Sequence, residues 1–226
     1  MILDFPLICN KLSRGGVEFV YQEKSVLQKI ITNCNNNSFN CITVDSDMST
    51  SDSLFVIATG TSKMPQITNI RDPRAIQFEK CLAKTMLDLA HLVVKDGEGI
   101  TKFIEVTVKG ADSHKAAFDI GKSIAESPLV KTAFAGEDPN WGRIVMAIGK
   151  SGLKVNKEKI SIFFGNNIVA EYGARSKEYD ECTVTEYMKN DSVIITVDLN
   201  SGSGGASIYT CDLTHDYISI NSDYRS

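Results

Sequence analysis

The stretch "SVIITVDLNSGSGGASIYTCDLTHDYISINSDY", residues 192–224, decides the fold class. Residues 192–200, 205–213 and 216–224 each alternate in character, which predicts three strands in succession. The glycine-rich segment 201–207 lacks the Lys-Ser/Thr ending of a phosphate-binding loop, so we expect a hairpin loop there. Successive strands favour a mixed α/β fold with antiparallel pairing over a doubly wound dinucleotide-binding sheet.

Upstream of this stretch, helices and strands are interleaved. Apolar residues at helical spacing, together with caps and breakers, predict helices at 24–31, 49–60, 74–94, 112–127, 139–152 and 176–190. Short alternating or β-rich runs predict strands at 39–47, 101–110, 159–165 and 167–173. The 226 residues suit one large domain or two small ones.

Composition narrows the class of partner. The formal net charge of −4 argues against a nucleic acid or an anionic membrane, which leaves a small molecule as the expected ligand. The six cysteines and three histidines are scattered without ligand spacing, so we expect no metal site and reduced thiols in a cytoplasmic protein. No signal peptide or apolar run of membrane-spanning length is visible, and we expect no membrane segment.

Two acidic segments are candidate sites. In "DGEGITK", residues 96–102, the flanking glycines allow a sharp turn that would present Glu98 to a bound ammonium group. An exposed loop acid without a ligand is the equal alternative. The acids Asp45, Asp47 and Asp52 lack the glycine and the closing Glu of a calcium loop, so we expect them to cap a helix.

Two further segments are open to more than one interpretation. In "GEDPNWGR", residues 136–143, we expect a scaffold in which residues 138–140 start a helix, Trp141 packs into the core and Arg143 pairs with Glu137 or Asp138. Direct contact with a substrate is the alternative. The tail "INSDYRS", residues 220–226, either frays or docks, and in the docked case Asn221 and Ser226 would supply polar groups.

Four of these segments together resemble one family. "SFNCITVDSDMSTSDS", "DGEGITKFIEVTVKGA", "IAESPLVKTAFAGEDPNWGRI" and "CDLTHDYISINSDYRS" occur in the order and spacing of the β (C-terminal) chain of ornithine acetyltransferase. The resemblance covers residues 38–226, while residues 1–37 diverge. It implies an ornithine acetyltransferase/aminopeptidase-like fold of the N-terminal-nucleophile type for residues 1–226, with a division into two subdomains near 110–155 as one alternative.

The resemblance also implies an acyltransferase of arginine biosynthesis. Members of the family are made as a precursor that cuts itself before a threonine, and the new N-terminal Thr takes acetyl from N-acetylornithine and passes it to glutamate. Some members accept acetyl-CoA as the donor, and no bound cofactor is implied. The oxyanion hole lies in the α-chain, so the implied partner is an α-chain from the same precursor or a neighbouring gene, in an αβ heterodimer that assembles further.

Substrate-binding positions of the family are matched by Glu98, Asn221 and Ser226. Met1 occupies the position of the nucleophile, and a thioether cannot carry a useful acyl ester. We therefore expect no intact catalytic residue and no turnover by this polypeptide alone.

The chain departs from the family at three other matched positions. Ile100 stands where Ala is common, Ser46 where Gly is common and His215 where Tyr is common. The alternative function is a non-catalytic remnant or an amino-acid-binding partner chain of the same fold. A third interpretation, an N-terminal-nucleophile amidase or aminopeptidase, would require Ser or Thr at the first position.

Overall fold

A computed structural model of the chain describes residues 23–58 and 64–224. These residues form two compact units, which we call unit 1 (23–40, 48–58 and 64–91) and unit 2 (41–47 and 92–224). Residues 110–155, where the sequence suggested a division, all lie inside unit 2. Each unit has its own cluster of buried apolar side chains.

Unit 1 is built on two helices, α2 (Lys24–Asn36) and the part of α3 (Pro73–Lys95) that precedes Leu92. Apolar side chains at helical spacing predicted both helices, and one face of each is buried. Helix α2 continues five residues beyond residue 31, where the sequence suggested its end, and the Nδ2 of Asn37 donates to the carbonyl of Asn33 at the helix end. The core of the unit contains Val26, Ile30, Cys34, Ile67, Ala75, Leu82 and Met86.

The helix expected at 49–60 is not formed. Residues 51–58 have no helical hydrogen-bonding pattern, and residues 59–63 lie outside the described ranges. The hydroxyl of Ser49 accepts from the backbone N–H groups of Ser51 and Asp52 at 3.2 and 3.1 Å. These local bonds compete with a helical start, and the exposed apolar residues that follow gain no burial from a helix.

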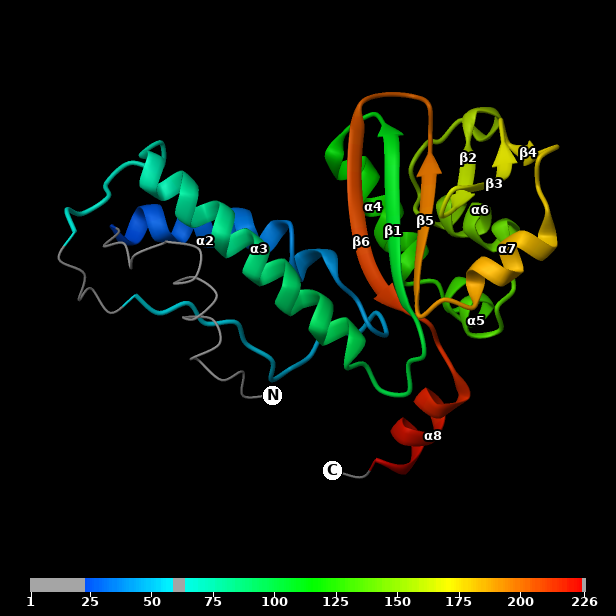
Figure 1. Ribbon diagram of the computed structural model, residues 1–226, viewed down its shortest axis with the longest axis horizontal. Coiled ribbons are helices and arrows are strands. Elements are labelled where there is room, and N and C mark those ends of the chain that lie inside the picture. The colour runs from blue at the N-terminus through cyan, green and yellow to red at the C-terminus, as the bar shows by residue number, and fades with distance from the viewer. Residues whose placement is uncertain (1–22, 59–63, 225–226) are drawn as a thin grey trace. The chain divides into compact units, whose positions relative to one another are not determined.

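Unit 2 contains a six-stranded sheet with the order β4-β3-β2-β5-β1-β6 (Figure 1). Its strands are β1 (Phe103–Ala111), β2 (Ser161–Phe164), β3 (Asn167–Glu171), β4 (Ala174–Arg175), β5 (Ser192–Asp198) and β6 (Gly204–Cys211). Only the β1–β5 pair is parallel, and the other neighbours are antiparallel. The predicted mixed sheet with antiparallel pairing is confirmed.

Helices and short turns complete the described elements of unit 2. They are α4 (His114–Ala125), α5 (Pro128–Ala135), α6 (Trp141–Lys150), α7 (Glu181–Met188), α8 (His215–Asp223) and the 3-10 turn Lys157–Lys159. A further 3-10 turn, Phe39–Cys41, ends at the boundary between the units. Helix α4 packs against β1 and β6 (Figure 1).

Buried and half-buried residues alternate along β1, and the buried ones contribute to the core of unit 2. Ile104, Val106 and Val108 are buried, and the residues between them are half-buried on the opposite face of the sheet. The rings of Phe134 and Phe164 stack at a centroid distance of 5.9 Å. One face of the sheet is therefore sealed by helices through apolar contacts, which supply most of the stability of such a layer.

The hairpin loop expected at 201–207 is not formed, because residues 204–207 belong to β6 and β1 lies between β5 and β6. The connection passes over the end of β1, and its glycines make that close passage feasible. A Cβ on Gly202 would lie 2.4 Å from the carbonyl oxygen of Ala111, and one on Gly204 would lie 2.3 Å from Ser113. Sequence proximity suggested a hairpin, but the central strand of the trio comes from ninety residues upstream.

The strand expected at 39–47 is reduced to a single bridge. Ile42 pairs with Tyr209 in parallel orientation, and the N–H of Thr43 donates to the carbonyl of Tyr209 at 3.0 Å. The segment 41–47 thus lies along the outer edge of β6. None of the helices in the described part of the chain is long and apolar enough to cross a membrane.

Candidate functional site

The antiparallel pairing of β1 and β6 brings two distant segments to one edge of the sheet. Phe103, at the start of β1, lies opposite Cys211, at the end of β6. The loop that precedes β1 contains Glu98, and the chain that follows β6 continues into α8. Both segments belong to unit 2.

The C-terminal segment 216–224 is a helix and not the expected strand. Thr214 caps α8 by accepting from the N–H of Tyr217 at 3.4 Å, and its hydroxyl donates to the carbonyl of Gly99 at 2.5 Å. This capping favours a helix over the strand that alternation suggested, because residues 216–224 have no neighbouring strand of the sheet to pair with.

Glu98 and Asn221 are in direct contact. The Nδ2 of Asn221 donates to Glu98 Oε2 at 2.8 Å and to the carbonyl of Tyr217 at 3.0 Å. Both residues are exposed, so a ligand can reach them from solvent. The carboxylate of Glu98, which this amide N–H orients, is an acceptor that suits an ammonium group.

Gly99 allows α8 to approach this loop closely. Its φ is +65°, and a Cβ there would lie 2.5 Å from the backbone nitrogen of Tyr217. A side chain at position 99 would push the first turn of α8 away from the loop that contains Glu98. The positive φ of Gly99 fits the sharp turn expected next to Glu98, and the group that approaches Gly99 closely is α8 itself.

Asp212 fixes the start of β1 from the opposite segment. Its buried carboxylate accepts from the N–H of Thr101 at 2.8 Å, the hydroxyl of Thr101 at 2.5 Å and the N–H of Lys102 at 3.0 Å. These three bonds tie the chain after Glu98 to the chain before α8. Asp212 is a residue that sequence reasoning missed, since nothing local distinguishes it from a strand-end acid.

A second tie joins α8 to the segment 41–47. The hydroxyl of Tyr217 donates to Asp45 Oδ2 at 2.9 Å. Burial and this bond to Asp45 raise the pKa of Tyr217 to about 12, so the phenol is protonated and acts as a donor at neutral pH. The expectation that Asp45 caps a following helix is wrong: its carboxylate accepts from the N–H of Asp47 and from Tyr217.

The family model of the ArgJ family matches residues 20–226 of this chain. The chain belongs to the ArgJ family. Two proteins named arginine biosynthesis bifunctional protein ArgJ are among its relatives. The one from Caulobacter vibrioides is 50% identical over 202 residues, which cover 89% of this chain and 50% of that protein. The one from Ruegeria pomeroyi is 51% identical over 204 residues, which cover 90% of this chain and 48% of that protein.

A solved ArgJ structure shares the fold. The crystal structure of arginine biosynthesis bifunctional protein ArgJ from Bacillus halodurans matches with a TM-score of 0.86 at 40% identity, covering 91% of this chain and 96% of that one. The fold expected from the resemblance is thereby confirmed. This chain spans about half the length of the curated ArgJ relatives it matches. The crystallised Bacillus halodurans chain, in contrast, is about as long as this chain.

The "GEDPNWGR" segment of this ArgJ chain joins α5 to α6. Asn140 caps α6 by accepting from the N–H of Arg143, and Trp141 packs partly against the core, as expected. The pairing expected for Arg143 is wrong: its guanidinium donates to the carbonyl of Leu129 at 2.7 Å and to Thr132 at 3.2 Å.

Glu137 has a different partner, the buried Lys102. Their side chains form an ion pair at 3.2 Å. Glu137 has a φ of +54°, a backbone conformation that is uncommon for a residue with a side chain. The segment therefore closes the helix-covered face of the sheet at the start of β1.

Lys131 is a buried cation beneath the same edge of the sheet. Its ammonium donates to Thr210 Oγ1 at 3.0 Å, to the carbonyl of Cys211 and to Cys211 Sγ at 3.5 Å. Burial lowers the pKa of Lys131, while the charges of Cys211, Asp212 and Asp45 act in the opposite direction. The hydrogen bonds of the ammonium thus stabilise the end of β6, while the removal of its charge from water is unfavourable.

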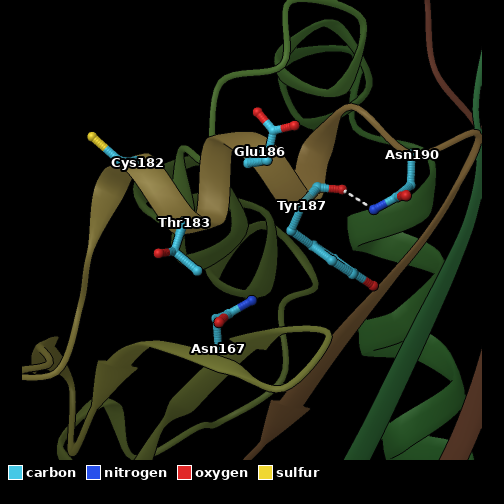
Figure 2. Close-up of a pocket in the computed structure, with 6 residues that line it drawn as sticks. All are labelled: Asn167, Cys182, Thr183, Glu186, Tyr187 and Asn190. Atoms are coloured by element: carbon cyan, nitrogen blue, oxygen red, sulfur yellow. Dashed lines mark hydrogen bonds between the residues drawn. The ribbon is translucent and has the colours of Figure 1, made fainter.

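An open hollow of about 580 Å³ lies elsewhere in unit 2, beside α7 (Figure 2). Two of its polar side chains already form hydrogen bonds with the backbone. Asn190 donates to the carbonyl of Tyr187 at 2.7 Å, and the Tyr187 hydroxyl accepts from the N–H of Ile194 at 2.9 Å. The lining residues are Asn167, Cys182, Thr183, Glu186, Tyr187 and Asn190. The hollow shares no lining residue with the contact between Glu98 and Asn221.

Two of the candidate site residues, Met1 and Ser226, lie outside the described residues. Ser46, where the resemblance implied that glycine is common, has a φ of +82°, a conformation that favours glycine. Across residues 23–58 and 64–224, no three His, Cys, Asp or Glu side chains are grouped so that they could hold a metal ion.

Proposed function

We propose that this chain is the β-chain of a glutamate N-acetyltransferase of arginine biosynthesis. In this proposal it supplies half of a pocket in which the family moves acetyl from N-acetylornithine to glutamate through an acyl-enzyme on an N-terminal Thr, a position that Met1 occupies in this sequence. The observation that carries the proposal is the 2.8 Å hydrogen bond between Asn221 and Glu98. It joins two residues that the resemblance assigned to one substrate site although 123 positions separate them.

The chemistry of this contact fits an amino-acid ligand. The carboxylate of Glu98 provides a negative charge next to the amide of Asn221, and both side chains are exposed. The ammonium group of ornithine or of N-acetylornithine would form charge-assisted hydrogen bonds with such a pair. Ser226 is proposed as a third substrate contact on the basis of the resemblance alone.

The partner in this proposal is the other half of the protein, the α-chain. The chain spans 50% of the Caulobacter relative, so a comparable length of polypeptide is available to complete the site. That half would supply the oxyanion hole that stabilises the tetrahedral intermediates. We therefore propose that turnover requires the αβ assembly and that this polypeptide alone has none.

The second face of the sheet is a suitable surface for that partner. Phe103, Glu105 and Thr107 alternate with the buried residues of β1 and are only half-buried, and Ile194 on β5 is 44% exposed. The ring of Phe103 stacks on Tyr209 of β6 at a centroid distance of 6.0 Å. A sheet with helices on one face commonly packs a second layer on the other, which is the role proposed for the α-chain.

The five cysteines among the described residues are free thiols. Free thiols fit a reducing compartment, so we propose that the protein works in the cytoplasm.

Acetyl-CoA is a second acetyl donor that the assembled protein is proposed to accept.

The test is acetyl transfer from N-acetylornithine to glutamate. The chain is assayed alone and after coexpression with the N-terminal half of the Caulobacter vibrioides relative. We expect no turnover by the chain alone and binding of ornithine by the assembly, and robust turnover by the chain alone would contradict the assignment of a half-site. An assembly that binds ornithine without acetyl transfer would instead support the non-catalytic alternative.

Replacing Glu98 isolates the proposed role of its charge. Glu98→Gln keeps an oxygen that can accept from Asn221 but removes the charge, so the affinity of the assembly for ornithine should fall about tenfold or more. Calorimetry measures this change. Glu186→Gln, an exposed acid on α7 that forms an ion pair with Lys189, is the matched control and should leave ornithine affinity unchanged.

A further inference from the structure

Helix α8 is attached to the rest of unit 2 mainly through polar contacts. Every residue from His215 to Asp223 is exposed except the half-buried Tyr217, and its large apolar side chains Ile218 and Ile220 are 61% and 44% exposed. Helices in proteins usually owe their position to a buried apolar face. The orientation of α8 must therefore depend on individual hydrogen bonds.

Three such bonds are spaced along the helix. At its start Thr214 donates to the carbonyl of Gly99, one turn later Tyr217 donates to Asp45, and a further turn on Asn221 donates to Glu98. Tyr217 and Asn221 are also joined directly, because the amide of Asn221 donates to the carbonyl of Tyr217. A displacement of Tyr217 is thus transmitted to the side chain that contacts Glu98.

We propose that Asp45 and Tyr217 are positioning residues that hold Asn221 against Glu98. This inference rests on the proposed function, because it assigns a role to two residues behind the proposed substrate site. Neither residue needs to touch the substrate. Their hydrogen bond prevents α8 from tilting about its capped start at Thr214.

The distance from Thr214 to Asn221 along α8 is long enough for a small tilt of the helix to displace Asn221. Seven residues of helix separate Thr214 from Asn221, which corresponds to about 10 Å at 1.5 Å per residue. A tilt of about 10° about Thr214 would move Asn221 by about 2 Å, more than a hydrogen bond of 2.8 Å tolerates. Displacements of about 1 Å in a binding constellation can cost about a hundredfold in rate.

Asp45 is itself well anchored. The preceding segment is bonded to β6 through the N–H of Thr43, and the hydroxyl of the following Ser46 donates to the carbonyl of Glu126 on the C-terminal end of α4. The buried ammonium of Lys131 attracts the carboxylate of Asp45 from beneath the sheet edge. Asp45 is therefore a fixed point against which α8 is held.

The experiment compares Tyr217→Phe with the unaltered chain, each assembled with the complementary half. Loss of the hydroxyl should make amide hydrogen exchange of residues 215–223 about fivefold faster. It should also weaken ornithine binding, measured by calorimetry, about three- to tenfold. Tyr172→Phe, at a tyrosine that is 69% exposed, is the matched control and should change neither quantity.

A rescue series separates positioning from general damage. Asp45→Ala should reproduce Tyr217→Phe, and the double variant should be no worse than either single variant. Asp45→Asn keeps an oxygen acceptor for the phenol and should restore ornithine affinity to within about twofold of the unaltered protein. The free energy of unfolding of unit 2, followed in urea through Trp141, should fall by no more than about 1 kcal/mol in any of these variants, as expected for the loss of single exposed hydrogen bonds.

The two proposals fail in different ways. If Tyr217→Phe changes neither exchange nor affinity in an assembly that binds ornithine, the positioning role is overturned and the proposed function stands. If the unaltered assembly binds no ornithine, the proposed function fails, and the exchange measurement alone decides whether Asp45 and Tyr217 hold α8.

Discussion

Replacing Asp212 by alanine should lower the free energy of unfolding of unit 2 by about 3–4 kcal/mol. The carboxylate of Asp212 is 2% exposed and accepts three hydrogen bonds, two of them from the backbone N–H groups of Thr101 and Lys102. Alanine leaves both N–H groups without that acceptor. Each orphaned group costs about 1–3 kcal/mol, with Lys102 at the upper end because it is buried.

Two milder variants divide this cost. Asp212→Asn keeps an oxygen for the two N–H groups and loses the negative charge, so the expected loss is about 1 kcal/mol. Thr101→Val removes only the hydroxyl that donates to Asp212 at 2.5 Å and should cost a similar amount. We therefore expect the largest loss for alanine, which leaves two N–H groups without that acceptor, and smaller, similar losses for asparagine and valine, which leave both of these hydrogen bonds in place.

Urea unfolding followed by tryptophan fluorescence measures these losses for one unit. Trp141 is the only tryptophan in the chain, and it packs partly against the core of unit 2. Its emission therefore reports the unit that contains Asp212. An Asp212→Ala chain within about 1 kcal/mol of the unaltered chain, at an unchanged m-value, would refute the assignment of Asp212 as the anchor of β1.

Two other changes test backbone strain and the buried lysine, again through Trp141 fluorescence in urea. Ser46 has a φ of +82°, so Ser46→Gly should be about 1 kcal/mol more stable than Ser46→Ala, because alanine keeps the backbone strain. Equal stabilities of the two variants would show that the backbone at residue 46 is not strained. The folded-state pKa of Lys131 is lowered by burial, so the cost of its charge is fully present below that pKa and disappears as the pH rises towards the ordinary value of 10.5. The stability of the unaltered chain relative to Lys131→Met should therefore increase over this alkaline range, and a flat or falling difference would show that Lys131 is not desolvated.

Local patterns in the sequence were sufficient for most of the sheet and its covering helices. Alternation identified β1, β2, β3, β5 and β6, and helical spacing identified α3, α4 and α6. These elements bury one face against a common core, so their apolar period is visible in the sequence. Helix α5, only eight residues long and directly before the polar loop to α6, was missed.

The errors arose where tertiary contacts outweigh local pattern. Residues 216–224 alternate like a strand, but they form α8 because Thr214 caps a helix that is then held by Asp45 and Glu98. The segment 201–207 looks like a hairpin loop, but its second half belongs to β6, and the connection before it crosses a strand that comes from far upstream. Neither outcome can be derived from a window of ten residues.

The candidate site shows the same division. The glycine-flanked Glu98 stood out by itself, and only the resemblance to a family linked it to Asn221. The residues that support this pair, Asp45, Asp212 and Tyr217, act across 111 to 172 positions of sequence. Their types are common at strand ends and helix caps, so only the structure shows that they converge.

The contact between Glu98 and Asn221 follows from one topological fact, the antiparallel pairing of β1 with β6. In an antiparallel pair the start of one strand lies beside the end of the other, and here Phe103 is opposite Cys211. The segment before β1 and the segment after β6 must therefore emerge at the same edge, which places residues 96–102 next to α8. A parallel pairing of the same strands would have put Glu98 and Asn221 at opposite ends of the sheet. The proposed site is thus built into the order of the strands, and the hydrogen bonds of Asp45, Asp212 and Thr214 adjust a proximity that the sheet has already created.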